Sequence, residues 1–114
     1  MAIKLHYQTL GSGKPVIILH GLFGSSRNWS SFAKKLSKQY QVINVDLRNH
    51  GKSDHIESMT YPEMAADIAL IIEENNLDQA HIIGHSMGGK VAMTFALQFR
   101  SLIDRLVVLD VAPV

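Results

Sequence analysis

Hydrophobic and polar residues along this chain follow two patterns, one typical of strands and one typical of helices. Short apolar runs with the length of buried strands occupy residues 16–19, 41–46, 80–83 and 105–110. Residues 3–8 alternate apolar and polar side chains instead, which predicts a half-buried edge strand. Apolar residues at helical spacing fill three segments between these runs, at 29–36, 61–75 and 88–99. This alternation predicts an α/β fold with a mainly parallel sheet and helices on both faces, in one domain.

The second predicted helix carries its own start signal. Thr60 and Glu63 have the spacing of a capping box, in which each side chain bonds the backbone N–H of the other residue, and Pro62 falls in the first turn. The preceding residues 47–57 are polar and predict a loop.

The most informative stretch is Gly84-His85-Ser86-Met87-Gly88. It fits the pattern G-x-S-x-G and lies between a predicted strand and a predicted helix, which is the context that this pattern requires. A sharp turn there lifts the serine clear of the sheet, in a sparsely allowed backbone conformation, and the flanking glycines let strand and helix pass closely. The stretch predicts Ser86 as a nucleophile and the Met87 N–H as an oxyanion donor. The alternative is a glycine-rich turn without chemistry, and the flanks favour the functional interpretation.

Ligands of open α/β sheets bind beyond the carboxyl ends of the strands, so the residues that follow each strand are candidates. His20-Gly21-Leu22 follows the first buried strand. The Leu22 N–H is the natural second donor of an oxyanion hole, because Gly21 allows a close approach of the backbone. A plain turn at the strand end is the alternative. We expect His20 to bond the loop backbone rather than to act as a base.

Asp110 ends the last predicted strand and is the candidate acid of a catalytic triad. A carboxylate there would orient an imidazole and support its positive form, and the order Ser, Asp, His is usual for this turn. The alternative is a structural aspartate that bonds the N–H groups of the following loop. The residues alone leave both roles open.

No histidine of this sequence is a good candidate for the general base. The chain has 6 histidines and none follows Ser86, whereas the usual order places the base after the serine. His85 flanks Ser86, so its side chain should point to the other side of the turn. His50 and His55 lie in the polar loop, where we expect exposure to solvent. The base would therefore have to come from outside these 114 residues.

Composition excludes several functional classes. The net charge is +1 and no basic stripe indicates a nucleic-acid partner. Cysteine is absent and no His, Asp and Glu spacing suits a metal, so neither a metal nor another cofactor is implied. The longest aliphatic run, residues 68–72, is too short to span a membrane, and the N-terminus lacks the apolar region of a signal peptide. We therefore expect a cytoplasmic location.

Three segments resemble the N-terminal half of an α/β-hydrolase. They are HGLFGS at 20–25, DLRNHGKS at 46–53 and GHSMGGK at 84–90. Asn49, where many relatives have glycine, and the ending at 109–114 narrow the similarity to the YbfF-type bacterial esterases, which are relatives of abhydrolase domain-containing protein 11. The resemblance covers essentially all 114 residues.

The resemblance implies a serine hydrolase that acts on short acyl esters and acyl thioesters through an acyl-enzyme intermediate. Ser86 would be the nucleophile, Leu22 and Met87 would supply the oxyanion hole, and Asp110 would be the acid, although other branches place the acid one strand later. The cap, the last strands and the catalytic histidine of the family are missing. Residues 1–114 would thus form a partial domain, incomplete at the C-terminal side, weakly active alone and open to self-association through an exposed sheet edge.

Two other functions stay open at this point. One is a non-catalytic fragment with a structural or interaction role. The other is a different serine-dependent chemistry of the same fold, such as that of a haloperoxidase or a C–C hydrolase, because most of the pocket walls lie outside this stretch. A serine at position 86 argues against dehalogenase or epoxide-hydrolase chemistry, which in this superfamily resembles an aspartate-ester mechanism.

Overall fold

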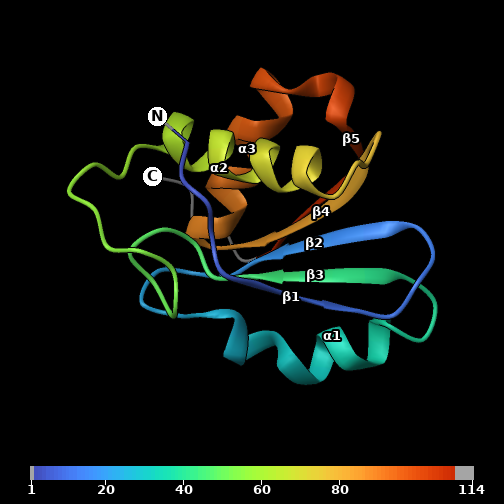
Figure 1. Ribbon diagram of the computed structural model, residues 1–114. Helices are drawn as coiled ribbons and strands as arrows, with labels where there is room; N and C mark the ends of the chain where they lie inside the picture. Colours follow the sequence, from blue (N-terminus) through green and yellow to red (C-terminus); the bar gives the residue numbers. More distant parts are fainter. Residues whose placement is uncertain (1, 110–114) are drawn as a thin grey trace.

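The computed structural model describes residues 2–109, and Figure 1 shows a central sheet with helices on both faces. The strands are β1 (Tyr7–Leu10), β2 (Pro15–Leu19), β3 (Gln41–Val45), β4 (Ala80–His85) and β5 (Ile103–Leu109). The helices are η1 (Ser26–Trp29), α1 (Ser30–Leu36), α2 (Tyr61–Glu74), α3 (Met87–Gln98) and η2 (Arg100–Leu102), the η elements being short 3-10 helices. The predicted α/β fold is confirmed. None of the described helices has the length and apolarity needed to cross a bilayer.

The strands form one sheet in the order β1-β3-β2-β4-β5. β1 pairs antiparallel with β3, and all other neighbours run parallel. Leu19 at the end of β2 lies beside Val45 of β3 and Gly84 of β4. The loops that follow β2, β3 and β4 therefore emerge together at the carboxyl ends of these strands, where ligands of parallel sheets bind (Figure 1).

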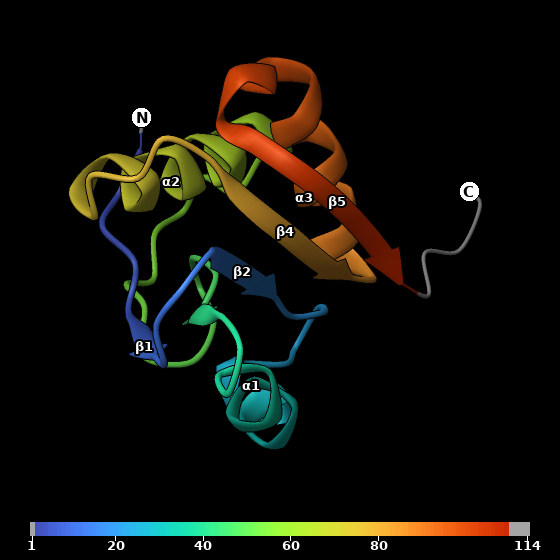
Figure 2. The same cartoon turned by 90° about the vertical axis from the view of Figure 1, so that its right-hand side faces the viewer.

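Each face of the sheet has its own hydrophobic layer. α2 and α3 cover one face and α1 covers the other, as Figure 2 shows. The larger core lies between the sheet and the helices α2 and α3, and its fully buried side chains include Ile17, Ile43, Ile68, Ile82 and Phe95. The smaller core, on the α1 side, contains Ile18, Ala33 and Val42. Because β2 and β3 are covered on both faces, successive residues of both strands are buried, and all of these buried residues except Asn44 are apolar.

The first strand lies later in the chain than predicted. Alternation placed it at residues 3–8, whereas β1 covers Tyr7–Leu10. The backbone N–H of Ile3 donates to Asp67 Oδ1 at 2.7 Å, and that of His6 donates to Ser53 Oγ at 2.8 Å. Distant side chains thus bind the donors that a strand would offer to its neighbour, so residues 3–6 do not join the sheet as a strand.

The last strand lies at an edge of the described sheet, beside β4, as expected for a partial domain that lacks the strands after it. The apolar run at residues 105–110 also suggested a buried strand, and β5 is less buried than that. Its apolar residues Leu106, Val107 and Leu109 remain 38%, 44% and 39% exposed. Apolar composition predicts that a strand forms, whereas its burial depends on which elements cover it.

The start of α2 follows the prediction. Thr60 Oγ1 accepts the backbone N–H of Glu63, and the Glu63 carboxylate accepts the backbone N–H of Thr60, which completes the capping box. The hydroxyl groups of Ser58 and Thr60 also donate to this carboxylate, and these bonds lower the pKa of Glu63 to about 2. The cap therefore keeps its charge through the neutral and mildly acidic range.

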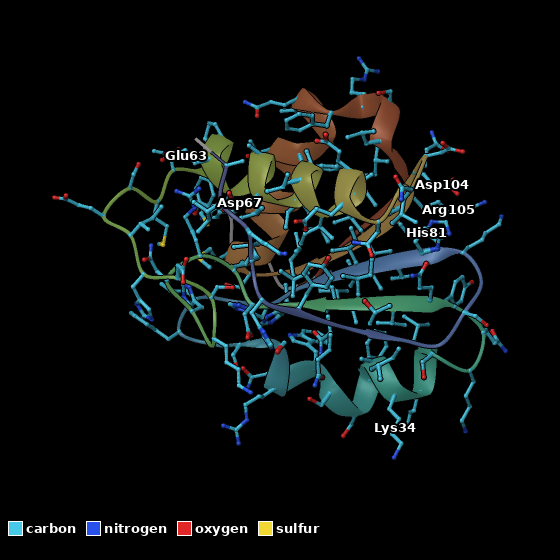
Figure 3. The ribbon with its side chains drawn as sticks, in the orientation of Figure 1. Lys34, Glu63, Asp67, His81, Asp104 and Arg105 are labelled. Carbon is cyan, nitrogen blue, oxygen red and sulfur yellow. The ribbon has the colours of Figure 1, made fainter. Side chains whose placement is uncertain are left out.

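A buried ion pair anchors the loop between β3 and α2. Arg48 is fully buried, and its Nε and Nη2 donate to the two carboxylate oxygens of Asp67 on α2, each at 2.8 Å. Its Nη1 donates to the Ser58 carbonyl at 2.9 Å and lies 3.6 Å from Glu63 Oε2. Figure 3 shows Glu63 and Asp67 at the same end of α2, beside this loop. Because Ile3 also donates to Asp67, one carboxylate holds both the loop and the N-terminal segment.

Substitution of Asp67 by asparagine tests this anchor. The D67N change removes the charge that compensates the Arg48 guanidinium, and breaking a buried pair in this way costs about 3 kcal/mol or more. We expect a decrease of that size in the free energy of unfolding measured with urea. Lys4→Ala is the control, since exposed Lys4 lies 3.8 Å from Glu74 and its loss should cost less than about 1 kcal/mol. Equal effects of the two substitutions would contradict the proposed anchor.

Candidate active site

Ser86 stands at the junction of β4 and α3, where the chain turns from strand to helix. Its φ of 54° and ψ of −116° lie in a region that residues other than glycine rarely adopt. The Ser86 N–H donates to the Leu109 carbonyl of β5 at 3.1 Å, and the Ser86 carbonyl accepts the Lys90 N–H of α3 at 3.1 Å. The backbone thus makes the strained turn that the G-x-S-x-G pattern predicts.

Gly84 and Gly88 are required because backbones meet at both positions. A Cβ atom on Gly84 would lie 2.4 Å from the carbonyl oxygen of Gly88, and one on Gly88 would lie 2.3 Å from the carbonyl oxygen of Leu19. Real Cβ atoms do not approach backbone atoms so closely, so any larger residue would displace α3 from the sheet. The start of α3 is therefore pressed against the end of β2.

The loop after β2 lies directly against Ser86. A Cβ atom on Gly21 would be 3.3 Å from the Cβ of Ser86 and 3.1 Å from Nδ1 of His85. In the part of the chain that the structure describes, no acceptor bonds the Leu22 N–H. Met87 is the first residue of α3, where N–H groups have no partner inside the helix. The structure thus brings the loop of Leu22 to the turn at Ser86 and Met87, and the oxyanion role of both N–H groups stays a prediction.

His20 sets the direction of the peptide group between Gly21 and Leu22. Its buried ring accepts the Leu47 N–H at Nε2, at 3.0 Å, so Nδ1 carries the proton and donates to the Gly21 carbonyl at 2.7 Å. The Gly24 N–H donates to the same oxygen at 3.0 Å. The C=O and N–H of a trans peptide point in opposite directions, so holding the Gly21 oxygen also aims the Leu22 N–H. His20 bonds the loop backbone, as predicted.

Electrostatics favours the neutral form of His20. Burial lowers the pKa of His20 below its ordinary 6.5, and the nearby His50 adds to this, whereas the bond to Gly21 and the Asp46 carboxylate oppose it. A neutral ring is what the accepted bond from Leu47 requires.

Asp46 ties the loops after β2 and β3 together. Burial alone would raise the pKa of Asp46, but the N–H groups of Ser26 and Lys52 donate to its carboxylate at 2.7 and 3.1 Å and bring the pKa below its ordinary value. Its carbonyl oxygen also accepts the Ser53 hydroxyl. The loops after β2 and β3 are thus joined through one ionised side chain.

Asp110, the predicted acid, lies outside the described residues. Its neighbour Leu109 pairs with His85 in the sheet and accepts the Ser86 N–H. The described end of β5 therefore lies beside the turn, and the role of Asp110 stays a prediction.

The prediction that His50 is exposed was wrong. His50 is only 7% exposed, its Nδ1 bonds the Arg48 carbonyl at 2.9 Å, and its Nε2 accepts the Phe23 N–H at 3.1 Å. Exposure was expected because the surrounding loop is polar. Its partner Phe23 lies far away in the sequence, so local polarity could not reveal the bond. The one feature of the sequence that could have indicated a structural role was the position of His50 within the family-like segment 46–53.

The other histidines lie in different surroundings. His55 is exposed, as predicted. His81 lies at the amino end of β4, where Nε2 is 3.8 Å from Asp104 Oδ2, at the opposite end of the sheet from the loops (Figure 3). The ring of His85 lies 5.5 Å from the ring of Trp29.

An open cavity of about 440 Å³ borders the loop after β2. Its walls are formed by Gly21, Leu22, Phe23, Gly24, Asn28, Trp29 and His85. Ser86 does not line the cavity, but Gly21 and His85, which adjoin Ser86, do. Among the described residues, no group of three His, Asp or Glu side chains could hold a metal ion.

Comparison with known proteins gives consistent matches. A family model described as "alpha/beta hydrolase fold" matches residues 14–113. The sn-1-specific diacylglycerol lipase ABHD11 of Xenopus laevis is 47% identical over 103 residues, which are 89% of this chain and 33% of that protein. Esterase YbfF of Escherichia coli strain K12 is 41% identical over 107 residues, which are 94% of this chain and 42% of that protein.

A solved structure, that of a marine microorganism esterase, superposes with a TM-score of 0.95 at 46% identity. The superposition covers 98% of this chain and 43% of that one, so the chain spans less than half the length of these relatives. The resemblance to YbfF-type esterases is confirmed. The match over residues 14–113 shows that this chain belongs to the α/β-hydrolase fold family.

Proposed function

We propose that the protein carrying this sequence is a serine hydrolase that cleaves carboxylic esters or acyl thioesters. The observation that carries the proposal is the strained backbone of Ser86, placed beside the loop that holds the Leu22 N–H. A turn of this kind presents a hydroxyl to a substrate and to a base at once. The names of ABHD11, a diacylglycerol lipase, and YbfF, an esterase, support acyl esters as the substrate class.

In the proposed reaction, Ser86 Oγ forms a bond to the acyl carbon while a base takes the hydroxyl proton. The bond from carbon to the leaving oxygen or sulfur then breaks, and the leaving group takes the proton from the base. Water attacks the resulting acyl-enzyme in the same way, which releases the acid and restores Ser86. The N–H groups of Leu22 and Met87 would stabilise the negative oxygen in both steps, and one such donor typically contributes about 10²–10³-fold in rate.

The base would be a histidine outside these 114 residues, oriented by Asp110 or by a later acid. Two arguments support this part of the proposal. His20 and His50 use both ring nitrogens to bond backbone groups. The relatives ABHD11 and YbfF are also much longer, because the matched region is 33% and 42% of their length.

The cavity beside the loop would take one end of the substrate. Leu22, Phe23 and Trp29 give its wall an apolar character, which suits a hydrocarbon chain. The haloperoxidase and C–C hydrolase alternatives would use the same turn at Ser86. The names of the relatives, and not the cavity wall, therefore favour acyl-ester chemistry over them.

Labelling with an alkyl fluorophosphonate tests the nucleophile in the full-length protein. We expect mass spectrometry to find the label on Ser86, because an activated serine reacts with this probe. Ser86→Ala should abolish labelling and lower ester hydrolysis by at least about 10³-fold. Ser101→Ala, at an exposed position of η2, is the control and should change neither. A label on another residue would overturn the assignment.

The 114-residue chain taken alone tests where the base lies. Loss of one triad member leaves only about 10³–10⁴-fold catalysis over water. We therefore expect very slow hydrolysis of a p-nitrophenyl ester by the purified chain, with little difference between wild type and Ser86→Ala. Fast turnover that depends on Ser86 would show that the base lies within these residues.

Acid pH tests the neutral state of His20. Folding lowers the pKa of His20, so the unfolded chain binds the proton more tightly than the folded protein does. The stability that the neutral ring contributes is therefore complete above pH 6.5 and is lost as the pH falls through the lowered pKa of the folded protein. We expect the midpoint of urea unfolding to fall between about pH 7.5 and about pH 5. The decrease should be smaller in His20→Asn, whose amide can donate to Gly21 without titrating. Equal decreases in both proteins would exclude this role.

A further inference from the structure

We propose that His50 is a positioning residue for the oxyanion hole: its Nε2 holds the Phe23 peptide group and thereby fixes the direction of the Leu22 N–H. The inference rests on the proposed function. Its basis is the bond from the Phe23 N–H to His50 Nε2, which is 3.1 Å long and joins the loop after β2 to the loop after β3.

The hydrogen bonds of His50 determine which nitrogen carries the proton. Nδ1 lies 2.9 Å from the Arg48 carbonyl oxygen, which can only accept, so Nδ1 is the donor. Nε2 is then the unprotonated nitrogen and accepts the Phe23 N–H. Both ring nitrogens are satisfied by backbone groups, so the imidazole acts as a fixed bridge between two loops.

The support behind this bridge is rigid. His50 is held by the carbonyl of Arg48, and the Arg48 side chain is held by both carboxylate oxygens of Asp67 on α2. A continuous path of short contacts thus runs from a core helix, through the buried ion pair, to the peptide group of Phe23. Such a support can define the position of the loop after β2.

The Phe23 backbone needs this support because its conformation is unfavourable. Its φ is 62°, in the left-handed region that residues with a Cβ rarely occupy. The side chain is 92% exposed, so packing of the ring does not hold the residue. Among the described residues, three bonds hold this turn: the Phe23 N–H donates to His50 Nε2, and His20 Nδ1 and the Gly24 N–H both donate to the Gly21 carbonyl.

Two imidazoles therefore hold two successive peptide groups. His20 bonds the Gly21 carbonyl, which belongs to the peptide group of the Leu22 N–H, and His50 bonds the N–H of the next peptide group. The two rings lie 5.1 Å apart. If the bond to His50 is lost, Phe23 can leave the left-handed region, which disturbs the bond from the Gly24 N–H to the Gly21 carbonyl and leaves His20 to hold the Leu22 peptide group alone. The hole would then keep the Met87 donor and hold the Leu22 donor less firmly.

Two substitutions of His50 separate its acceptor from its donor. The amide oxygen of a glutamine side chain can reach the place of Nε2, so His50→Gln keeps an acceptor for Phe23. An asparagine amide reaches only the place of Nδ1, so His50→Asn keeps a donor for the Arg48 carbonyl and loses the acceptor. The exposed neighbouring histidine gives the control His55→Asn.

The experiment measures Ser86 labelling by a fluorophosphonate and p-nitrophenyl ester hydrolysis in the full-length protein. We expect His50→Asn to slow both by about tenfold, the factor that one net hydrogen bond is worth. Because the donor acts in the transition state, kcat and kcat/KM should fall together while KM stays constant. His50→Gln and His55→Asn should stay within about threefold of wild type.

Amide hydrogen exchange gives a readout that does not depend on activity. The Phe23 N–H should exchange about tenfold faster in His50→Asn than in wild type or His50→Gln. Equal rates of labelling and of exchange in all variants would overturn the inference. So would equal losses of activity in His50→Asn and His50→Gln together with equally lowered midpoints of urea unfolding, because that result would show only a general loss of stability. If wild type is not labelled at Ser86, the proposed function fails, whereas the exchange of Phe23 still decides whether His50 holds the loop.

Discussion

The site depends on the close contact between the start of α3 and the ends of β2 and β4. At Gly84 and Gly88 the backbones are so close that a Cβ would lie 2.4 and 2.3 Å from carbonyl oxygens. With the helix held this near the sheet, the chain can pass from β4 to α3 only through a sharp turn, and Ser86 takes a φ of 54°. The packing of α3 on the core keeps this conformation in place. Fold stability and serine geometry are therefore properties of the same contact.

Buried polar groups hold the loops around that turn. Arg48 and Asp67 form a paired and hydrogen-bonded unit, and Asp46 binds N–H groups from two loops. His20 and His50 extend these interactions to the loop beside Ser86. Each of these five side chains has hydrogen-bond partners, which is the condition under which buried polarity stabilises a structure instead of weakening it. Loops built in this way hold their backbone donors through fixed hydrogen bonds.

Features that depend on nearby residues were predictable from the sequence. The capping box of Thr60 and Glu63 and the turn at Ser86 are set by residues within a few positions of each other, and both were found. Features that depend on distant partners were not predictable. The N–H of Ile3 bonds Asp67, and the ring of His50 bonds Phe23. Alternation and local polarity contain no information about such partners.

Phe23 shows how the loop separates two tasks. Its main chain is held by His50, whereas its ring projects into solvent and forms part of the cavity wall. The side chain contributes little to the position of the backbone, so a different side chain would reshape the wall and leave the main-chain donors in place. Under the proposed function, a change of side chain at this residue would alter substrate preference without rebuilding the turn at Ser86.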